Sequence, residues 1–137
     1  MNGRQKATRN SWKREPFPEH TRLNFNRTFT ADEHEQISYG FIPESMDHHW
    51  FIYLEEERLY FYRSWTGFCI YEVGLERNGN AYDAAEILVN RNPDQYGGTD
   101  DKYDAALVSF LIDKFLLRKE TAFPLPSNKP RHRTTNI

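Results

Sequence analysis

The stretch Arg63–Gly67, Arg-Ser-Trp-Thr-Gly, brings together side chains that can recognise an anion. An arginine offers a rigid fork of N–H donors that suits a phosphate or a carboxylate. The hydroxyls of Ser64 and Thr66 can donate hydrogen bonds to the same anion, and the indole of Trp65 can stack on a flat ring. We therefore expect a ligand site formed by Arg63, Ser64, Trp65 and Thr66.

The alternative for this stretch is a hairpin turn with a structural role. In that interpretation Trp65 covers the edge of the core, and Arg63 pairs with Glu55 or Glu57. Aromatic residues in hairpins mostly serve packing. The sequence leaves both interpretations open.

Acidic residues gather at a second place, where Asp100, Asp101 and Asp104 follow Thr99. They stand at the start of an apolar helical pattern, and capping and the helix dipole account for acids in a first turn. Asp100 or Asp101 could also serve as a general base or hold Mg²⁺, which needs few protein carboxylates.

The remaining reactive residues lack the spacing of a catalytic or metal site. His48 and His49 are adjacent, so in a strand they point to opposite faces and do not chelate one metal. Cys69 is the only cysteine, which predicts a buried strand residue rather than a nucleophile. No phosphate-binding glycine loop, nucleophile elbow or dinucleotide motif is present. We expect neither a metal nor a cofactor.

The elements that must position these residues begin with a run rich in aromatic side chains, residues 50–75. It predicts three β-strands at about 49–54, 58–63 and 68–76. The connections are too short for any but antiparallel neighbours, so the strands form a meander. Their second face is rich in tyrosine, which indicates that both faces of the sheet are at least partly covered.

Two helices and one more strand are predicted around this meander. Thr30 and Glu33 form a capping box for a short helix that ends near Tyr39. Residues 82–90 carry alanines that favour helix and an Ile-Leu-Val run that favours strand, and we favour the strand. The clearest helix spans about 101–118, with apolar residues at helical spacing. The predicted fold class is α+β, an antiparallel three- or four-stranded meander packed against a C-terminal helix.

Charge is distributed unevenly along the chain. Residues 44–120 carry 15 acidic against 8 basic side chains, a net charge of −7, although the whole chain carries only −2. Both ends are basic and contain proline. We expect a mobile basic arm at 1–22, a single globular domain at 23–120, and a disordered, proline-containing basic tail at 121–137.

Composition excludes several classes of protein. No apolar run is long enough for a membrane-spanning helix, and the basic N-terminus lacks the apolar core of a secretory signal. A single cysteine cannot form an internal disulfide, which fits a reducing compartment. A cytoplasmic location is expected, with no membrane partner.

The blocks W-F-I-Y and R-S-W-T-G-F-C-I-Y resemble a family of small uncharacterised bacterial proteins, and N-R-N-P-D-Q-Y followed by T-D-D-K-Y-D is similar too. Related segments occur near or fused to ADP-ribosylglycohydrolase-type enzymes. The resemblance implies a neighbourhood of nucleotide or ADP-ribose metabolism, with this domain as an accessory rather than a catalyst. It brings no catalytic residues, and Asp100 and Asp101 are not equated with that enzyme's metal ligands because the surrounding motif is missing.

The first functional hypothesis is a non-enzymatic binding module. Through Arg63–Gly67 it would recognise an anionic ligand, such as a nucleotide or an ADP-ribose-like molecule, or a protein partner. The second hypothesis is a small hydrolase of a phosphorylated or ADP-ribosylated substrate. In it Asp100 or Asp101 would be the base or metal ligand, and Arg63 would hold the anion.

A third hypothesis is single-stranded nucleic-acid binding. The basic ends would clamp the backbone, and bases would stack on a platform formed by Tyr53, Tyr60, Tyr62 and Tyr71. The acidic body of the chain opposes this hypothesis, because it repels phosphates.

Overall fold

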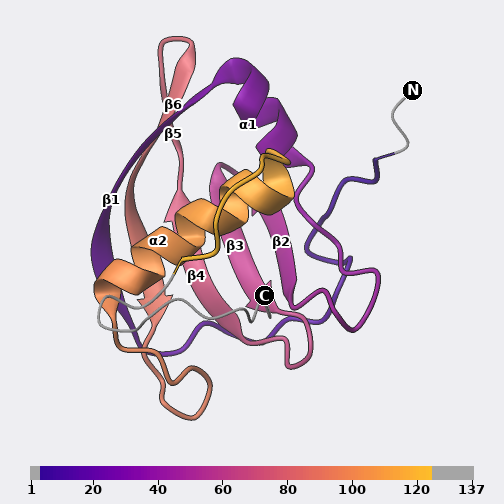
Figure 1. Ribbon diagram of the computed structural model, residues 1–137, viewed down its shortest axis with the longest axis vertical. Helices are drawn as coiled ribbons and strands as arrows, with labels where there is room; N and C mark the ends of the chain where they lie inside the picture. The colour runs from indigo at the N-terminus through magenta and orange to yellow at the C-terminus, as the bar shows by residue number, and fades with distance from the viewer. Residues whose placement is uncertain (1–3, 125–137) are drawn as a thin grey trace.

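The computed structural model describes residues 4–124 as one antiparallel sheet with helices packed against it. The spatial order of the strands is β1-β6-β4-β3-β2, and the short β5 pairs with β6. Helix α2 crosses one face of the sheet (Figure 1). The elements are β1 (His20–Thr30), α1 (Ala31–Ser38), β2 (Trp50–Glu55), β3 (Arg58–Arg63), β4 (Cys69–Gly74), β5 (Glu76–Asn78), β6 (Ala81–Asn90), α2 (Asp101–Leu111) and a π-helical turn, η1 (Ile112–Leu116).

The α+β class and the predicted meander are confirmed, with six strands instead of three or four. Strands β2, β3 and β4 pair in antiparallel order, and the strand favoured for residues 82–90 is β6. Two strands were missed. β1 begins at His20, inside the stretch predicted as an arm, and β5 begins at Glu76, where the third predicted strand was expected to end.

Both predicted helices begin where their caps indicated. In α1, the amide of Glu33 donates to Thr30 Oγ1 at 3.0 Å, and the amide of Thr30 donates to Glu33 Oε1 at 2.9 Å. Gly40 follows with φ of +65°, and a Cβ there would lie 2.3 Å from the carbonyl oxygen of Ile52, so only glycine fits. Asp100 caps α2, which ends with η1 at Leu116 instead of residue 118.

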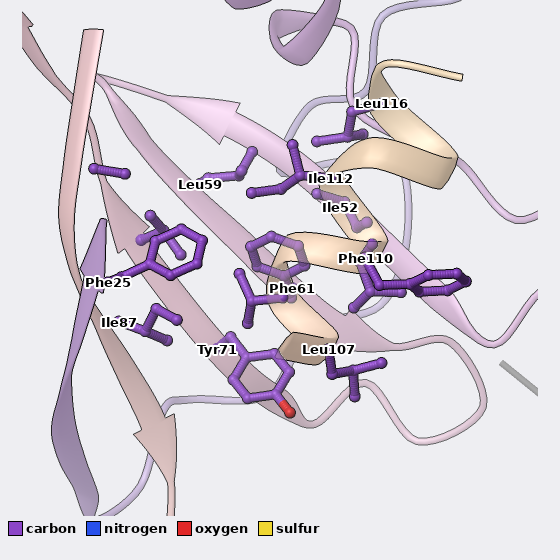
Figure 2. Packing of buried hydrophobic residues seen from close by; sticks show 14 of the residues in the cluster. Phe25, Ile52, Leu59, Phe61, Tyr71, Ile87, Leu107, Phe110, Ile112 and Leu116 are labelled. Atoms are coloured by element: carbon purple, nitrogen blue, oxygen red, sulfur yellow. The ribbon is translucent and has the colours of Figure 1, made fainter. Parts of the chain in front are cut away.

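The main core lies between α2 and the face of the sheet that it crosses (Figure 2). Burial of each large apolar side chain contributes about 1.5–3 kcal/mol. The helix and η1 contribute Leu107, Phe110, Ile112 and Leu116, and the sheet contributes Phe25, Ile52, Leu59, Phe61, Tyr71 and Ile87.

The opposite face of the sheet carries a second apolar cluster, so the prediction that both faces are covered is confirmed. Its buried residues come from β2, β3 and β4, together with Ala7 of residues 4–19, which we call the N-terminal segment. Phe17 of the same segment also packs against the cluster. The amide of Ala7 donates to the carbonyl oxygen of Tyr39 at 2.8 Å. Arg9 pairs with Glu55. From residue 4 onward, the predicted arm therefore has defined contacts with the domain.

The C-terminal end of the described chain runs back over α2. The ring of Phe123 meets Phe110 edge to face, with 5.3 Å between the ring centroids. From residue 125 the predicted basic tail lies outside the described residues. No helix within residues 4–124 is long and apolar enough to cross a membrane.

Candidate functional site

The turn between β3 and β4 holds the candidate ligand residues in a fixed conformation. Gly67 adopts φ of +80°, and its amide donates to the carbonyl oxygen of Arg63 at 2.8 Å. The amide of Phe68 donates to Thr66 Oγ1 at 3.1 Å. The N-terminal segment braces the turn from outside, because the amide of Glu15 donates to the carbonyl oxygen of Gly67 at 2.8 Å. A rigid turn positions side chains for binding without an ordering cost.

Arg63, at the end of β3, is half-buried and stacks on the core. Its guanidinium carbon lies 4.9 Å from the ring centroid of Trp50, a cation–π contact. The predicted ion pair with Glu55 or Glu57 is wrong, because Glu55 pairs with Arg9 and Glu57 lies 2.7 Å from His34 Nε2. Within residues 4–124, Arg63 forms no ion pair with a carboxylate.

Burial lowers the pKa of the Arg63 guanidinium from its ordinary value. The group nevertheless stays charged at neutral pH, because an arginine starts above 12. A half-buried charge that no carboxylate neutralises favours the entry of an anion.

A pocket of about 210 Å³ opens beside this guanidinium, and we call it the ligand pocket. Its walls combine two cationic or titratable groups, two aromatic rings and two polar side chains. They are His49, Arg63, Trp65, Thr66, Phe68 and Gln95.

The aromatic and imidazole walls of the ligand pocket contact each other. The ring of Trp65 is 59% exposed and meets His49 edge to face, with 5.4 Å between the centroids. Burial, followed by the positive charge of Arg63, lowers the pKa of His49. At neutral pH the imidazole is therefore uncharged, and an anion bound beside it would favour its protonation.

Three of the four predicted ligand residues line the ligand pocket, and Ser64 does not. The hydroxyl of Ser64 donates to the carbonyl oxygen of His48 at 2.7 Å, and the residue is buried. Its amide also donates to the carbonyl oxygen of His49 at 2.9 Å. Ser64 thus anchors the turn to the chain before β2. Among the predicted residues, the arrangement leaves Arg63, Trp65 and Thr66 as ligand contacts.

A buried polar network lies on the main-core side of the sheet. Asp104, in the first turn of α2, is fully buried and accepts hydrogen bonds from Tyr71 Oη at 2.7 Å, from Arg91 Nη2 at 2.8 Å and from Tyr96 Oη. Burial raises the pKa of both phenols, so they stay protonated and donate. Sequence reasoning grouped Asp104 with the acids of a helix start and missed its burial, although its neighbours Ala105 and Leu107 marked an apolar face.

A separate set of hydrogen bonds holds the loop after β6 beside the ligand pocket. The amide nitrogen of the buried Asn90 side chain donates to Gln95 Oε1 at 3.0 Å and to the carbonyl oxygen of Cys69 at 2.8 Å. This places Gln95 at the wall of the ligand pocket. Asn90 and Gln95 both belong to the block N-R-N-P-D-Q-Y, but neither residue was assigned to the ligand site from the sequence.

The acids proposed as a base or metal ligands already have partners. Asp100 accepts from the amide of Tyr103 at 3.0 Å as the helix cap, and Asp101 pairs with Arg91 at 2.6 Å. Neither lines the ligand pocket. Across residues 4–124, no group of three or more histidine, cysteine or acidic side chains is arranged to hold a metal ion. Cys69 is buried, as predicted.

The four tyrosines of the proposed stacking platform do not share a face. Tyr53, Tyr60 and Tyr62 lie together with the second apolar cluster, and Tyr53 and Tyr60 stack with 4.9 Å between the ring centroids. Tyr71 points into the main core instead. A register shift between Phe61 and Tyr62 changes the alternation of β4 relative to β3.

Comparisons with family models, curated proteins and solved structures find no match to this chain. The resemblance to a small bacterial family stays a prediction. Function is therefore inferred from the geometry of the site.

Proposed function

We propose that this protein is a binding module that recognises an anionic ligand, of the nucleotide or ADP-ribose type, in the ligand pocket. The observation that carries the proposal is the half-buried guanidinium of Arg63, which has no carboxylate partner within residues 4–124 and opens onto the exposed ring of Trp65. A planar guanidinium binds a phosphate or a carboxylate through two parallel hydrogen bonds.

The size of the ligand pocket suits the anionic group and leaves the rest of the ligand outside. A volume of about 210 Å³ is below the ~300–1,000 Å³ of pockets that enclose a drug-sized molecule. A phosphate fits beside Arg63, with the hydroxyl of Thr66 as a second donor. The ring of Trp65 offers a stacking surface at the rim, where an aromatic base would add about 1–3 kcal/mol.

A non-catalytic role accords with the other residues of the site. The hydrolase hypothesis needs a base or a metal beside the anion, and Asp100 and Asp101 are engaged away from the ligand pocket. It stays a prediction, as does nucleic-acid binding. The proposed setting is the cytoplasm, because the one cysteine, Cys69, is a free thiol and a reducing compartment preserves it.

The experiment is a calorimetric titration of the full chain with ADP-ribose, AMP, ADP and inorganic phosphate. Wild type is compared with Arg63→Ala and with the matched control Arg58→Ala. Arg58 begins the same strand but pairs with Glu72 at 3.5 Å and lies outside the ligand pocket. We expect Arg63→Ala to abolish binding and Arg58→Ala to retain it.

A second variant, Trp65→Ala, separates stacking from anion recognition. It should lower the affinity for the nucleotides and ADP-ribose by at least tenfold and leave the affinity for inorganic phosphate unchanged. If no ligand of the panel binds, or if Arg63→Ala binds as well as wild type, the proposed function is wrong.

A further inference from the structure

The N-terminal segment is hydrogen-bonded directly to the turn that carries the ligand residues. Trp12 Nε1 donates to the carbonyl oxygen of Ser64 at 2.7 Å. The amide of Glu15 donates to the carbonyl oxygen of Gly67 at 2.8 Å. These two carbonyl groups stand on either side of the two ligand residues at the tip of the turn. The segment therefore holds the backbone on both sides of the residues that line the ligand pocket.

Close packing accompanies these hydrogen bonds. A Cβ atom at Gly67 would lie 3.3 Å from Lys13 Cγ, 3.4 Å from the carbonyl oxygen of Lys13 and 3.5 Å from the amide nitrogen of Arg14. The segment thus passes over the turn in van der Waals contact. A change in the backbone at Gly67 would disturb the segment, and a displaced segment would release Gly67.

The segment has few apolar anchors on the rest of the domain. Residues 4–19 form neither a helix nor a strand. Ala7 is buried, Phe17 packs against the second apolar cluster, and the exposed Arg9 pairs with Glu55. Exposed ion pairs contribute little, and a segment with few buried apolar contacts opens at a lower free-energy cost than the strands of a sheet. The segment should therefore detach before the sheet unfolds.

The turn also has anchors that do not involve the segment. The hydroxyl of Ser64 donates to the carbonyl oxygen of His48, and its amide donates to that of His49. The amide of Gly67 closes the turn on the carbonyl oxygen of Arg63. Loss of the segment should therefore loosen the turn without unfolding it. A ligand would then have to order the turn as it binds, which lowers its affinity.

We propose that Trp12 is a positioning residue for the ligand pocket, and that docking of the N-terminal segment and binding of the anionic ligand favour each other. This inference rests on the proposed function and adds regulation to it. A ligand on Trp65 and Thr66 favours the ordered turn, and the ordered turn favours the docked segment. Coupling between two sites is reciprocal, so any event that removes the segment also lowers the affinity of the ligand pocket.

The first measurement is the calorimetric affinity of the full chain for ADP-ribose, in wild type, Trp12→Phe and the matched control Asn10→Ala. Phenylalanine keeps an aromatic ring and lacks the N–H that donates to Ser64. Asn10 is exposed and belongs to the same segment. We expect Trp12→Phe to lower the affinity at least about fivefold, and Asn10→Ala to leave it unchanged.

The second measurement tests the reciprocal effect by trypsin cleavage after Lys13 and Arg14. Saturating ADP-ribose should slow this cleavage at least about fivefold, because the docked segment is protected. Cleavage after Arg77, which is exposed in β5, should keep its rate, and this excludes a general stabilisation of the chain. Arg63→Ala should abolish the protection. Equal cleavage of the segment with and without ADP-ribose would contradict the coupling.

The third measurement needs no ligand. Amide hydrogen exchange at Gly67, followed by NMR, reports opening of the turn. Trp12→Phe should accelerate it at least about fivefold and leave exchange at Val89, in the buried part of β6, unchanged. An unchanged rate at Gly67 overturns the inference whether or not a ligand binds.

The outcomes separate this inference from the proposed function. If Trp12→Phe binds ADP-ribose as tightly as wild type while Arg63→Ala does not bind it, the inference is wrong and the proposed function stands. If wild type binds no ligand of the panel, the proposed function is wrong and the coupling is wrong with it.

Discussion

Replacement of the buried Asp104 by asparagine should destabilise the domain far more than replacement of an exposed acid at a helix start. The carboxylate is fully buried and accepts from Tyr71 at 2.7 Å, from Arg91 at 2.8 Å and from Tyr96. Asparagine keeps the shape but removes the charge, and its amide offers donors where the carboxylate offered acceptors. Loss of one partner of a buried pair costs about 3–5 kcal/mol, because the other charge stays buried without compensation.

A matched control exists on the same helix. Asp101 pairs with the same arginine, Arg91, at 2.6 Å, but its side chain is 63% exposed. Exposed ion pairs contribute about 0.2–1 kcal/mol, so Asp101→Asn should cost less than about 1 kcal/mol. Arg91 retains Asp101 in the Asp104→Asn variant, which places the expected cost near the lower limit, about 3 kcal/mol.

The assay is unfolding in guanidinium chloride at pH 7, followed by tryptophan fluorescence. The slope is the dependence of the unfolding free energy on denaturant concentration, and the midpoint is the concentration at which half of the protein is unfolded. A lower midpoint with an unchanged slope reports a loss of stability without a change in the native state's compactness. If Asp104→Asn costs no more than Asp101→Asn, the buried network does not stabilise the fold, and our account of its energetics is refuted.

Three further predictions concern the core, the thiol and the ligand pocket. Phe110→Ala should lower the free energy of unfolding by about 3–5 kcal/mol in the same assay, because the ring is 5% exposed beneath α2, and an unchanged midpoint would contradict the packing of that helix. Burial raises the pKa of the Cys69 thiol, so a thiol reagent at pH 8 should label the native chain far more slowly than the chain in denaturant, and equal rates would show that Cys69 is accessible. Burial and Arg63 lower the pKa of His49, so Arg63→Ala should raise that pKa and a bound phosphate should raise it in wild type, both measured by NMR titration. Because the unfolded state binds the proton first, near pH 6.5, His49 makes stability fall as the pH drops from there through its folded pKa, and a His49→Gln variant that keeps the full loss of stability would contradict this assignment.

Local signals in the chain predicted much of the secondary structure. The capping box of Thr30 and Glu33 acts within one turn of backbone and is found where the sequence placed it, and the cap of α2 is Asp100, one of the acids expected at that helix start. Such signals work because their energies arise between residues three or four apart. Strand β1 also carried a signal, since Leu23, Phe25 and Phe29 lie at even spacing.

Strand β1 was missed because a charged side chain interrupts this apolar pattern. Arg27 occupies the same parity as Leu23 and Phe25 and reaches η1, where Arg27 Nη2 donates to Asp113 Oδ1 at 3.0 Å. Its partner lies 86 residues away, and a register shift between Asn24 and Arg27 further disturbs the pairing with β6. A pattern read along the chain cannot identify a partner that the folded chain supplies from so far away.

In the candidate site too, residue identity predicted some features and only the folded chain revealed the others. Residue types alone selected Arg63, Trp65 and Thr66, because a guanidinium, an indole and a hydroxyl have chemistry that does not depend on the fold. Tertiary structure decided that Ser64 turns inward to the carbonyl oxygen of His48, and that the carboxylates expected to pair with Arg63 are engaged elsewhere. It also added Gln95, which was not assigned to the site from the sequence.

By itself, the sequence determined the chemical types at the hairpin, the caps of both helices and the acidic balance of the body, since all of these depend on residue identity or on neighbours within a few positions. Only the tertiary structure decided which charges stay unpaired and which apolar side chains stay exposed. Those properties depend on what approaches each group from distant parts of the chain. The N-terminal segment covers the tyrosine-rich face and brings Trp12 beside Trp65, contacts that no local pattern specifies.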